Sequence, residues 1–239
     1  MRRSGWVLAM LVALAGCAAP PAPVVPPRPV ATAPAPPSLS PAAAVARFRA
    51  VVDRVEPVAE AVCRVQAPQR NCDFQILVDV RPGLPINAFQ TVDRAGRPVL
   101  IFTAAMLLDA RSADELAFVL GHEAGHHIAG HLDRARETAV ATAIVAGVLA
   151  QAGGGSAEAV QVAQELGAAV GRRAFSQDFE LEADAIGTLI AFRAGFDAER
   201  GAAVFTRLPD PGNRFLGTHP PNAARIDTVR ATLARLRRG

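Results

Sequence analysis

The run His122-Glu123-Ala124-Gly125-His126 combines two imidazoles and a carboxylate at a spacing that suits metal chemistry. On an α-helix, side chains four positions apart lie on one face, so both histidines can reach one metal ion. Glu123 points to the adjoining face, where its carboxylate can hold a metal-bound water and accept its proton. The pattern predicts the catalytic helix of a zinc hydrolase, with Glu123 as general base. The alternative is a core helix whose histidines only form hydrogen bonds.

A third protein ligand is expected further along the chain, because catalytic zinc sites use three protein ligands and leave one position for water. In Glu180-Leu181-Glu182-Ala183-Asp184, the first and last carboxylates are four positions apart and share one helical face. We expect Glu180 to bind the metal. Asp184 is expected to accept the spare ring N–H of a ligand histidine and so fix its tautomer. Glu182 is the main rival for the ligand role, and a solvated acidic surface is the alternative for the whole cluster.

Two helices must position these groups. Ser112 and Glu115 fit a capping box that starts the first helix, expected over residues 113–131. Apolar residues follow at helical spacing and indicate one buried side: Leu116, Val119, Leu120, Ala124 and Ile128. The second helix carries Glu180 and is expected to end near residue 194, before Gly195. His127 and His131 are rotated from His126 by roughly 100° and 140°, so we expect them to pack or hydrogen-bond and not to bind the metal.

These residues carry a resemblance to a known family. The run from Glu115 to His131 resembles the active-site helix of the zinc metalloproteases of peptidase family M48, which include HtpX-like and BepA-like envelope proteases, and Glu180 to Asp184 matches the family's second motif. Two weaker matches are similar to the family's edge strand beside the substrate cleft and to its late His-Pro segment. They are Asn87-Ala88-Phe89, and Thr218-His219-Pro220 followed by Arg225-Ile226. The resemblance covers about residues 43 to 235.

The resemblance implies one Zn²⁺ per chain and a role for each matched residue. His122, His126 and Glu180 would hold the metal, Glu123 would be the base, and Asp184 would support a ligand histidine. Asn87, Ala88 and Phe89 would pair with an extended polypeptide substrate by β-augmentation. His219 and Arg225 fall where family members place groups near the oxyanion, and in some members the matching histidine approaches the zinc and suppresses activity. The alternative for His219 is a loop histidine before a Pro-Pro turn.

The N-terminus indicates export. Arg2 and Arg3 precede an apolar segment, Trp6 to Ala15, that is too short to span a bilayer. Leu14-Ala15-Gly16-Cys17 then reads as a lipobox, so we expect residues 1–16 to be a lipoprotein signal peptide and Cys17 to carry a membrane-anchoring lipid. Ala18 favours the outer membrane by analogy with lipoprotein sorting. The expected location is the bacterial cell envelope, facing the periplasm; an ordinary signal peptide is the alternative.

The two remaining cysteines, Cys63 and Cys72, are expected to form a disulfide in an oxidising periplasm, with two free buried thiols as the rival. Residues 17–41 are rich in proline and alanine, which favours an extended tether and no core. Residues 42–239 are then the zinc metalloprotease domain.

The expected fold class is α+β, a zincin-like (gluzincin), mostly helical domain with a small three-stranded sheet beside the active-site helix. Strands are expected at 74–80, 87–92 and 98–103, with a turn at 93–96. Other helices are expected at 42–66, 104–109, 156–171, 197–207 and 222–237. Pro57 is expected to kink or split the first of these. The apolar stretch 137–152 is too short to span a membrane, and its place as lid, membrane contact or core stays open.

The predicted function is a membrane-anchored zinc metalloendopeptidase that cleaves unfolded or misassembled envelope proteins. The chain carries a net charge of +3, which falls by two when Arg2 and Arg3 leave with the signal, and nothing indicates a nucleic-acid partner. A chaperone or scaffold for outer-membrane protein assembly with a latent protease site is the main alternative, and contact with that assembly machinery is expected. A structural zinc domain with a closed four-ligand site is another. We expect a minimal form of the family, without C-terminal helical repeats.

Overall fold

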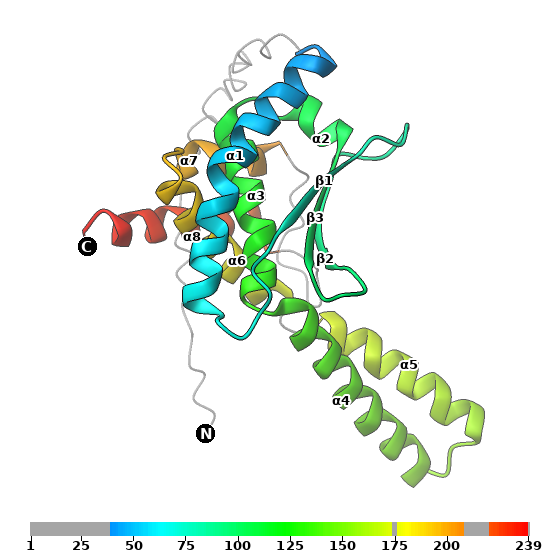
Figure 1. Ribbon diagram of the computed structural model, residues 1–239. Coiled ribbons are helices and arrows are strands. Elements are labelled where there is room, and N and C mark those ends of the chain that lie inside the picture. Colours follow the sequence, from blue (N-terminus) through cyan, green and yellow to red (C-terminus); the bar gives the residue numbers. More distant parts are fainter. Residues whose placement is uncertain (1–38, 174–175, 208–219, 239) are drawn as a thin grey trace, which may run out of the picture. The chain divides into compact units, whose positions relative to one another are not determined.

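The structure is a computed structural model that describes residues 39–173, 176–207 and 220–238 of the 239-residue chain (Figure 1), all within one unit that spans Pro36–Gly239. Its strands are β1 (Gln75–Asp79), β2 (Ala88–Val92) and β3 (Pro98–Thr103). Its helices are α1 (Pro41–Gln66), α2 (Ala104–Asp109), α3 (Ala113–Ile128), α4 (His131–Ala152), α5 (Ala157–Arg173), α6 (Ser176–Arg193), α7 (Ala198–Gly201), the 3₁₀ helix η1 (Ala202–Thr206) and α8 (Asn222–Leu236). The predicted α+β class, mostly helical with a small three-stranded sheet, is confirmed.

Helix α1 forms one wall of the core. Ser40 caps its N-terminus by accepting from the backbone N–H of Ala43, and Pro41 occupies the first turn, where its missing N–H costs nothing. Pro57 does not split the helix, which continues to Gln66. Val55 and Ala59, on either side of the proline, are both buried, so packing against the core holds the two halves in one helix.

One edge of the sheet lies beside helix α3, which carries the His122–His126 motif. Its order is β1-β3-β2, with β1 parallel and β2 antiparallel to the central β3. The predicted turn between β2 and β3 forms around Asp93, whose carboxylate accepts from Ala95 and Arg97, and around Gly96 at φ 79°. Within the part of the chain that the structure describes, β2 pairs with β3 alone, so its other edge can meet a further strand, and β2 also contacts α3.

Cys63 and Cys72 form a disulfide, as expected from the sequence. The bond joins the last turn of α1 to the segment that precedes β1. Both cysteines are buried in the hydrophobic core, so the bond fixes the connection that brings the chain from α1 into the sheet.

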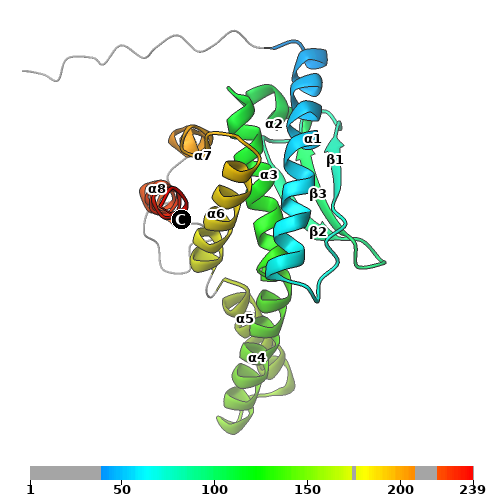
Figure 2. The same ribbon diagram turned by 60° about the vertical axis from the view of Figure 1, so that its left-hand side comes forward.

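Helix α3 lies between α1 and α6, as Figure 2 shows. The α3 and α6 backbones touch at glycine: a Cβ on Gly121 would lie 2.8 Å from the carbonyl oxygen of Gly187. Helix α3 ends at Ile128 and not near residue 131, because Gly130 takes a left-handed conformation (φ 71°) that no helix interior contains. His131 therefore starts a new helix in a different direction.

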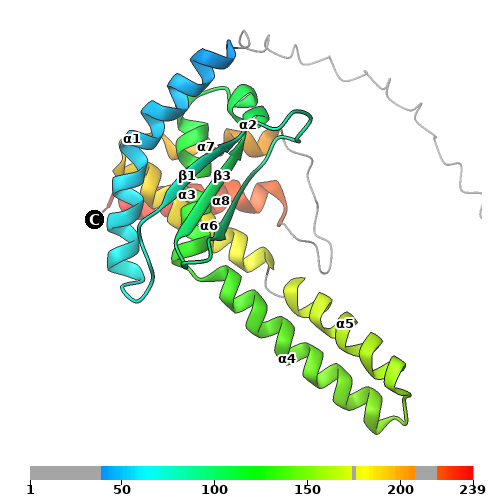
Figure 3. The same cartoon turned by 45° about the vertical axis from the view of Figure 1, so that its right-hand side comes forward.

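Helices α4 and α5 form a hairpin that extends away from the sheet (Figure 3). The apolar stretch expected at 137–152 belongs to α4, but it is not core: His131, Ala139 and Gly147 are the buried residues of this helix. The large aliphatic side chains of the hairpin are exposed instead, namely Val140, Ile144, Val145, Val148, Leu149, Val162, Leu166 and Val170. Among the described residues, no helix is both long enough and apolar enough to traverse a bilayer.

The C-terminal elements close the other side of α6. The segment predicted to be helical at 197–207 divides into the short α7 and the 3₁₀ helix η1, and α8 then packs on α6 and η1. Asp197 caps α7 by accepting from the backbone N–H of Arg200. Helix α8 matters for the site because it delivers Arg225, a buried side chain, to the side of α6.

Candidate metal centre

Helices α3 and α6 bring together three groups that can bind one metal ion. His122 and His126 come from α3 and Glu180 from α6, and one ligand atom of each lies within 4.8 Å of the others. The two Nε2 atoms are 3.0 Å apart, and each is 3.5 Å from an oxygen of Glu180. Donor atoms on a tetrahedral zinc with bonds of about 2.0–2.2 Å lie roughly 3.3–3.6 Å from one another. Two imidazoles and a carboxylate at this spacing fit such an ion.

The outer nitrogen of His122 contacts a carboxylate. Nδ1 lies 2.8 Å from Oδ1 of Asp184, so the ring donates there and leaves the Nε2 lone pair for a metal. Burial alone would lower the pKa of His122, but the hydrogen bond and charge of Asp184 raise it above its ordinary value. Asp184 is fully buried and also receives two hydrogen bonds from Arg225, at 2.6 and 2.7 Å. The arginine offsets the charge that Asp184 would otherwise hold alone in the core.

The outer nitrogen of His126 contacts another histidine. Its Nδ1 lies 2.8 Å from Nδ1 of His131, whose Nε2 lies 3.1 Å from a carboxylate oxygen of Glu182. Burial lowers the pKa of His126 to about 2, helped by the neighbouring His122, and burial also lowers the pKa of His131. Although burial opposes it, hydrogen bonds from His131 and Arg134 hold the pKa of Glu182 below its ordinary value. Glu182 thus contacts His131, the neighbour of His126, and not His126 itself.

His127 points away from the metal-binding face, where the helical rotation places it. Its Nε2 lies 2.7 Å from the backbone carbonyl oxygen of Asn71, and its ring meets Phe74 edge-on with centroids 5.6 Å apart. The residue is buried and ties α3 to the segment next to the Cys63–Cys72 disulfide. His127 is therefore a packing and hydrogen-bonding residue.

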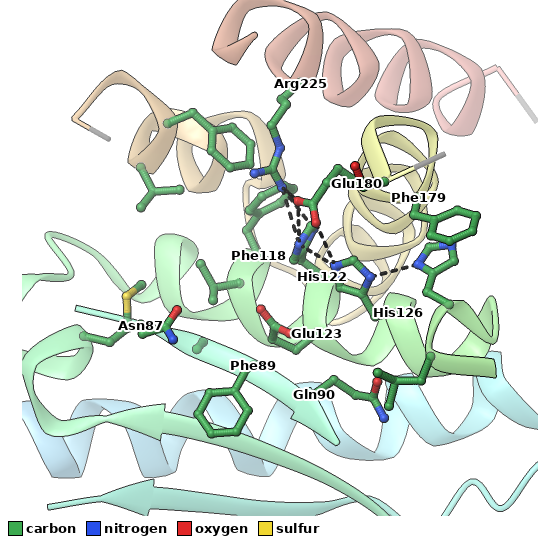
Figure 4. Close-up of a pocket in the computed structure, with 18 of the residues that line it drawn as sticks. Asn87, Phe89, Gln90, Phe118, His122, Glu123, His126, Phe179, Glu180 and Arg225 are labelled. Atoms are coloured by element: carbon green, nitrogen blue, oxygen red, sulfur yellow. Dashed lines mark hydrogen bonds and ion pairs between the residues drawn. The ribbon is translucent and has the colours of Figure 1, made fainter. Parts of the chain in front are cut away.

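Glu123 lies between the metal-binding face and the sheet. In Figure 4 its carboxylate points into the space between α3 and β2, on the side where Asn87, Phe89 and Gln90 lie. Burial raises the pKa of Glu123 to about 7, although the interaction with His122 and a backbone hydrogen bond from Gln90 act in the opposite direction. A carboxyl group with this pKa can both take up and release a proton near neutral pH.

A cavity of about 490 Å³ opens over these groups. Asn87, Ala88 and Phe89, the residues expected to meet substrate, line it from the edge strand β2, and Phe89 is 39% exposed. Three buried aromatic residues from α3, α6 and η1 also line it: Phe118, Phe179 and Phe205. The cavity thus joins the edge strand to the three candidate metal-binding groups.

Arg225 lines the cavity and contacts His122 as well as Asp184: its Nη2 lies 3.3 Å from Nδ1 and 3.4 Å from Nε2 of that ring. Besides its two bonds to Asp184, its Nη2 lies 3.3 Å from an oxygen of Glu180, and its guanidinium sits 3.9 Å from the centroid of the Phe205 ring. The side chain is 7% exposed in this arrangement. The structure brings together the residues expected from helical spacing, which are His122, His126, Glu180 and Asp184. No local sequence pattern marks the ion pair between Arg225 and Asp184. His219 and the lipobox Cys17 lie outside the described residues.

Comparisons with known proteins agree with this geometry. The model of Peptidase family M48 matches residues 46–233. The mitochondrial metalloendopeptidase OMA1 of Arabidopsis thaliana is 32% identical over 131 residues, which are 53% of this chain and 26% of that protein. A putative beta-barrel assembly-enhancing protease of Vibrio cholerae serotype O1 is 34% identical over 125 residues, which are 49% of this chain and 26% of that protein. The matched region is about a quarter of each curated relative. No solved structure matches the chain significantly.

Proposed function

The chain belongs to Peptidase family M48, and from this membership we propose that it is a zinc-dependent endopeptidase. The observation that carries the proposal is the convergence of His122, His126 and Glu180 on one point, with Glu123 beside them in a cavity bounded by an edge strand. Three protein donors leave one position of a tetrahedral ion for water, as hydrolysis requires. The donor set of two nitrogens and one oxygen suits zinc.

In the proposed mechanism, His122, His126 and Glu180 would hold the ion, which would supply Lewis acidity to a water and to the scissile carbonyl. Glu123 would accept a proton from the attacking water and deliver it to the leaving nitrogen. Burial raises the pKa of this carboxyl to about 7 in the metal-free protein, and a bound cation would favour the ionised form that acts as the base. Asp184 orients His122, and Arg225, which also contacts His122 and Glu180, balances the charge of Asp184. A role for Arg225 or His219 at the oxyanion remains part of the proposal.

The proposed substrate is an extended or unfolded polypeptide. Asn87 uses its backbone N–H and C=O on Thr103, and alternation along the antiparallel ladder turns those of Ala88 outward, where they can pair with any extended chain whatever its sequence. The exposed side chains of Ile86 and Phe89, which line the cavity, favour apolar side chains of the substrate. A folded protein would have to expose a free strand to bind in this way, so the site selects for unfolded segments.

The proposed place of action is the bacterial cell envelope. A relative that is named for β-barrel assembly supports this placement, as does the N-terminal sequence with its apolar segment and lipobox. We propose that residues 1–16 are removed, that Cys17 is lipidated, and that residues 17–41 tether the domain to a membrane facing the periplasm. The exposed aliphatic side chains of the α4–α5 hairpin support the second candidate, a scaffold that holds assembly intermediates.

The test is Glu123→Gln in the full chain. The variant should retain zinc, measured as metal content per chain, and lose cleavage of an unfolded protein such as casein by a factor of about 10²–10⁴. Glu137→Gln on the exposed part of α4 is the matched control and should cleave like wild type. Unchanged cleavage by Glu123→Gln would refute the mechanism. Full complementation of a gene deletion by the inactive variant would support the scaffold instead.

A further inference from the structure

The two metal-binding histidines are supported in different ways. Nδ1 of His122 meets a carboxylate directly, whereas Nδ1 of His126 meets the Nδ1 atom of His131 at 2.8 Å. A hydrogen bond between two ring nitrogens needs one protonated partner and one with a free lone pair, and each neutral imidazole has one nitrogen of each kind. The direction of this bond therefore decides which nitrogen of His126 is left to bind a metal.

Glu182 determines that direction. Its carboxylate has no proton to give: one oxygen already accepts from Arg134 at 2.7 Å, and the same oxygen lies 3.1 Å from Nε2 of His131. His131 must then donate from Nε2, which leaves its Nδ1 as the acceptor. His126 donates from its own Nδ1 to this acceptor, and its Nε2 lone pair is free on the side of His122 and Glu180.

The surroundings of His131 hold its ring in this position. The ring is 5% exposed and stacks on Phe179 with centroids 4.4 Å apart and planes 9° apart. Arg134 lies 4.3 Å from the centroid of the same phenylalanine ring and also binds Glu182. The left-handed turn at Gly130 brings His131 back toward His126 after α3 has ended. The ring is thus fixed by contacts on α4 and α6.

We propose that Glu182 and His131 form a positioning relay that fixes the tautomer and orientation of His126 for metal binding. The relay rests on the proposed metal site and deepens it, because it assigns a role to two residues outside the ligand set. Both histidine ligands then end in a carboxylate from α6: His122 directly through Asp184, and His126 through His131 to Glu182. Helix α6 therefore supplies Glu180 as one ligand and fixes the tautomers of the other two, His122 and His126.

The first experiment measures zinc affinity by competition with a chelator, using full-length protein. His131→Phe keeps an aromatic ring against Phe179 but has no acceptor for His126, and its affinity should fall by about 10–100-fold. His131→Asn places a carbonyl oxygen where Nδ1 was and should recover most of the loss. Glu182→Leu should give a smaller loss, since it removes the bias on the His131 tautomer but keeps the ring.

A matched control is His127→Phe, which alters a buried histidine next in sequence to His126 that contacts the backbone carbonyl of Asn71 and has no contact with the relay. Its zinc affinity should equal that of wild type. Metal-free thermal unfolding of every variant shows whether the fold is kept. Wild-type affinity in His131→Phe, or an equal loss in folded His131→Phe and His131→Asn, would overturn the relay. A wild-type chain that binds no metal would instead overturn the proposed site.

Nitrogen-15 NMR of the histidine rings gives a readout that a merely structural role for His131 would not change. In the metal-free wild type, His126 should show protonated Nδ1 and unprotonated Nε2. In His131→Phe and Glu182→Leu its signals should move toward a mixture of the two tautomers, while those of His127, which contacts the backbone carbonyl of Asn71, should stay unchanged. A His126 ring whose tautomer is the same in all three proteins would contradict the proposal.

Discussion

The α3–α6 pair and the α4–α5 pair both bring helix backbones into direct contact at glycine. A Cβ on Gly187 would lie 2.7 Å from the backbone nitrogen of His122, and a Cβ on Gly167 would lie 2.5 Å from the carbonyl oxygen of Thr142. The first pair is covered by α1 and α8 and carries the metal-binding groups. The second pair turns its small residues inward and exposes its aliphatic ones. Both pairs thus share close backbone contact at glycine. They differ in their surroundings: α1 and α8 cover the α3–α6 pair, whereas the aliphatic side chains of the α4–α5 pair are exposed.

We expect the two helix pairs to differ most in how much a leucine-to-alanine substitution lowers the free energy of unfolding. Leu120→Ala on α3 removes a fully buried side chain and should lower the free energy of unfolding by about 2–5 kcal/mol. Leu149→Ala on α4 removes a side chain that is 68% exposed and should change it by no more than about 0.5 kcal/mol. Chemical denaturation of both variants measures this. A large loss in Leu149→Ala would mean that the hairpin is covered in solution.

The glycine contacts provide the second comparison. Gly187→Ala forces apart α3 and α6 at His122, so it should destabilise the fold by about 1–3 kcal/mol and also weaken metal binding. Gly167→Ala forces apart α4 and α5 and should loosen the hairpin while metal affinity stays that of wild type. Chelator competition and denaturation are measured on both proteins. Equal metal affinities in the two variants would show that the α3–α6 distance does not control the site.

The disulfide tests whether the α1 side of the core stabilises the fold without shaping the site. The double variant Cys63→Ala, Cys72→Ala should lose about 2–3 kcal/mol of stability, because a short closed loop no longer restricts the unfolded chain. Metal affinity should not change, since neither cysteine contacts the metal-binding groups. The measurement is denaturation with and without bound zinc. A loss of affinity larger than the loss of stability explains would contradict this separation.

The smallest expected effect is the dependence of cleavage on pH. Glu123 acts as a base only when ionised, and burial raises its pKa to about 7 in the metal-free protein. A bound cation lowers that value, so kcat/KM should fall about tenfold per pH unit on an acid limb that lies at or below about pH 7. A hairpin variant such as Leu149→Ala should give the same profile. A limb that moves with the hairpin substitution would link the two regions.

Helical periodicity explains which parts of the site the sequence could predict. His122, His126, Glu180 and Asp184 were found because residues four apart share a face, and that rule needs no tertiary structure. The rule turned His131 away from His126 on a single helix running to residue 131, but His131 begins α4 and its Nδ1 lies 2.8 Å from Nδ1 of His126. That contact depends on the left-handed Gly130, which ends α3 earlier than the pattern indicated.

Long-range packing explains what the sequence could not predict. The pairing of Arg225 with Asp184 joins residues 41 positions apart, and no local pattern marks it. The apolar run in α4 has the composition of a core helix, yet most of its large side chains are exposed, because Gly167 and Gly171 let α5 pack on the small residues of α4. The strands and α2 were predicted to within one or two residues, since turn residues and alternation mark them locally.

The ion pair between Arg225 and Asp184 has a consequence for the order in which the helices can fold. Asp184 is fully buried in the folded protein, and its charge is balanced by Arg225, which follows 41 residues later in the chain. A nascent chain that stops short of Arg225 would have to bury that carboxylate alone, which the core does not favour. Burial of Asp184 beneath His122 is thereby coupled to the docking of α8 on α6.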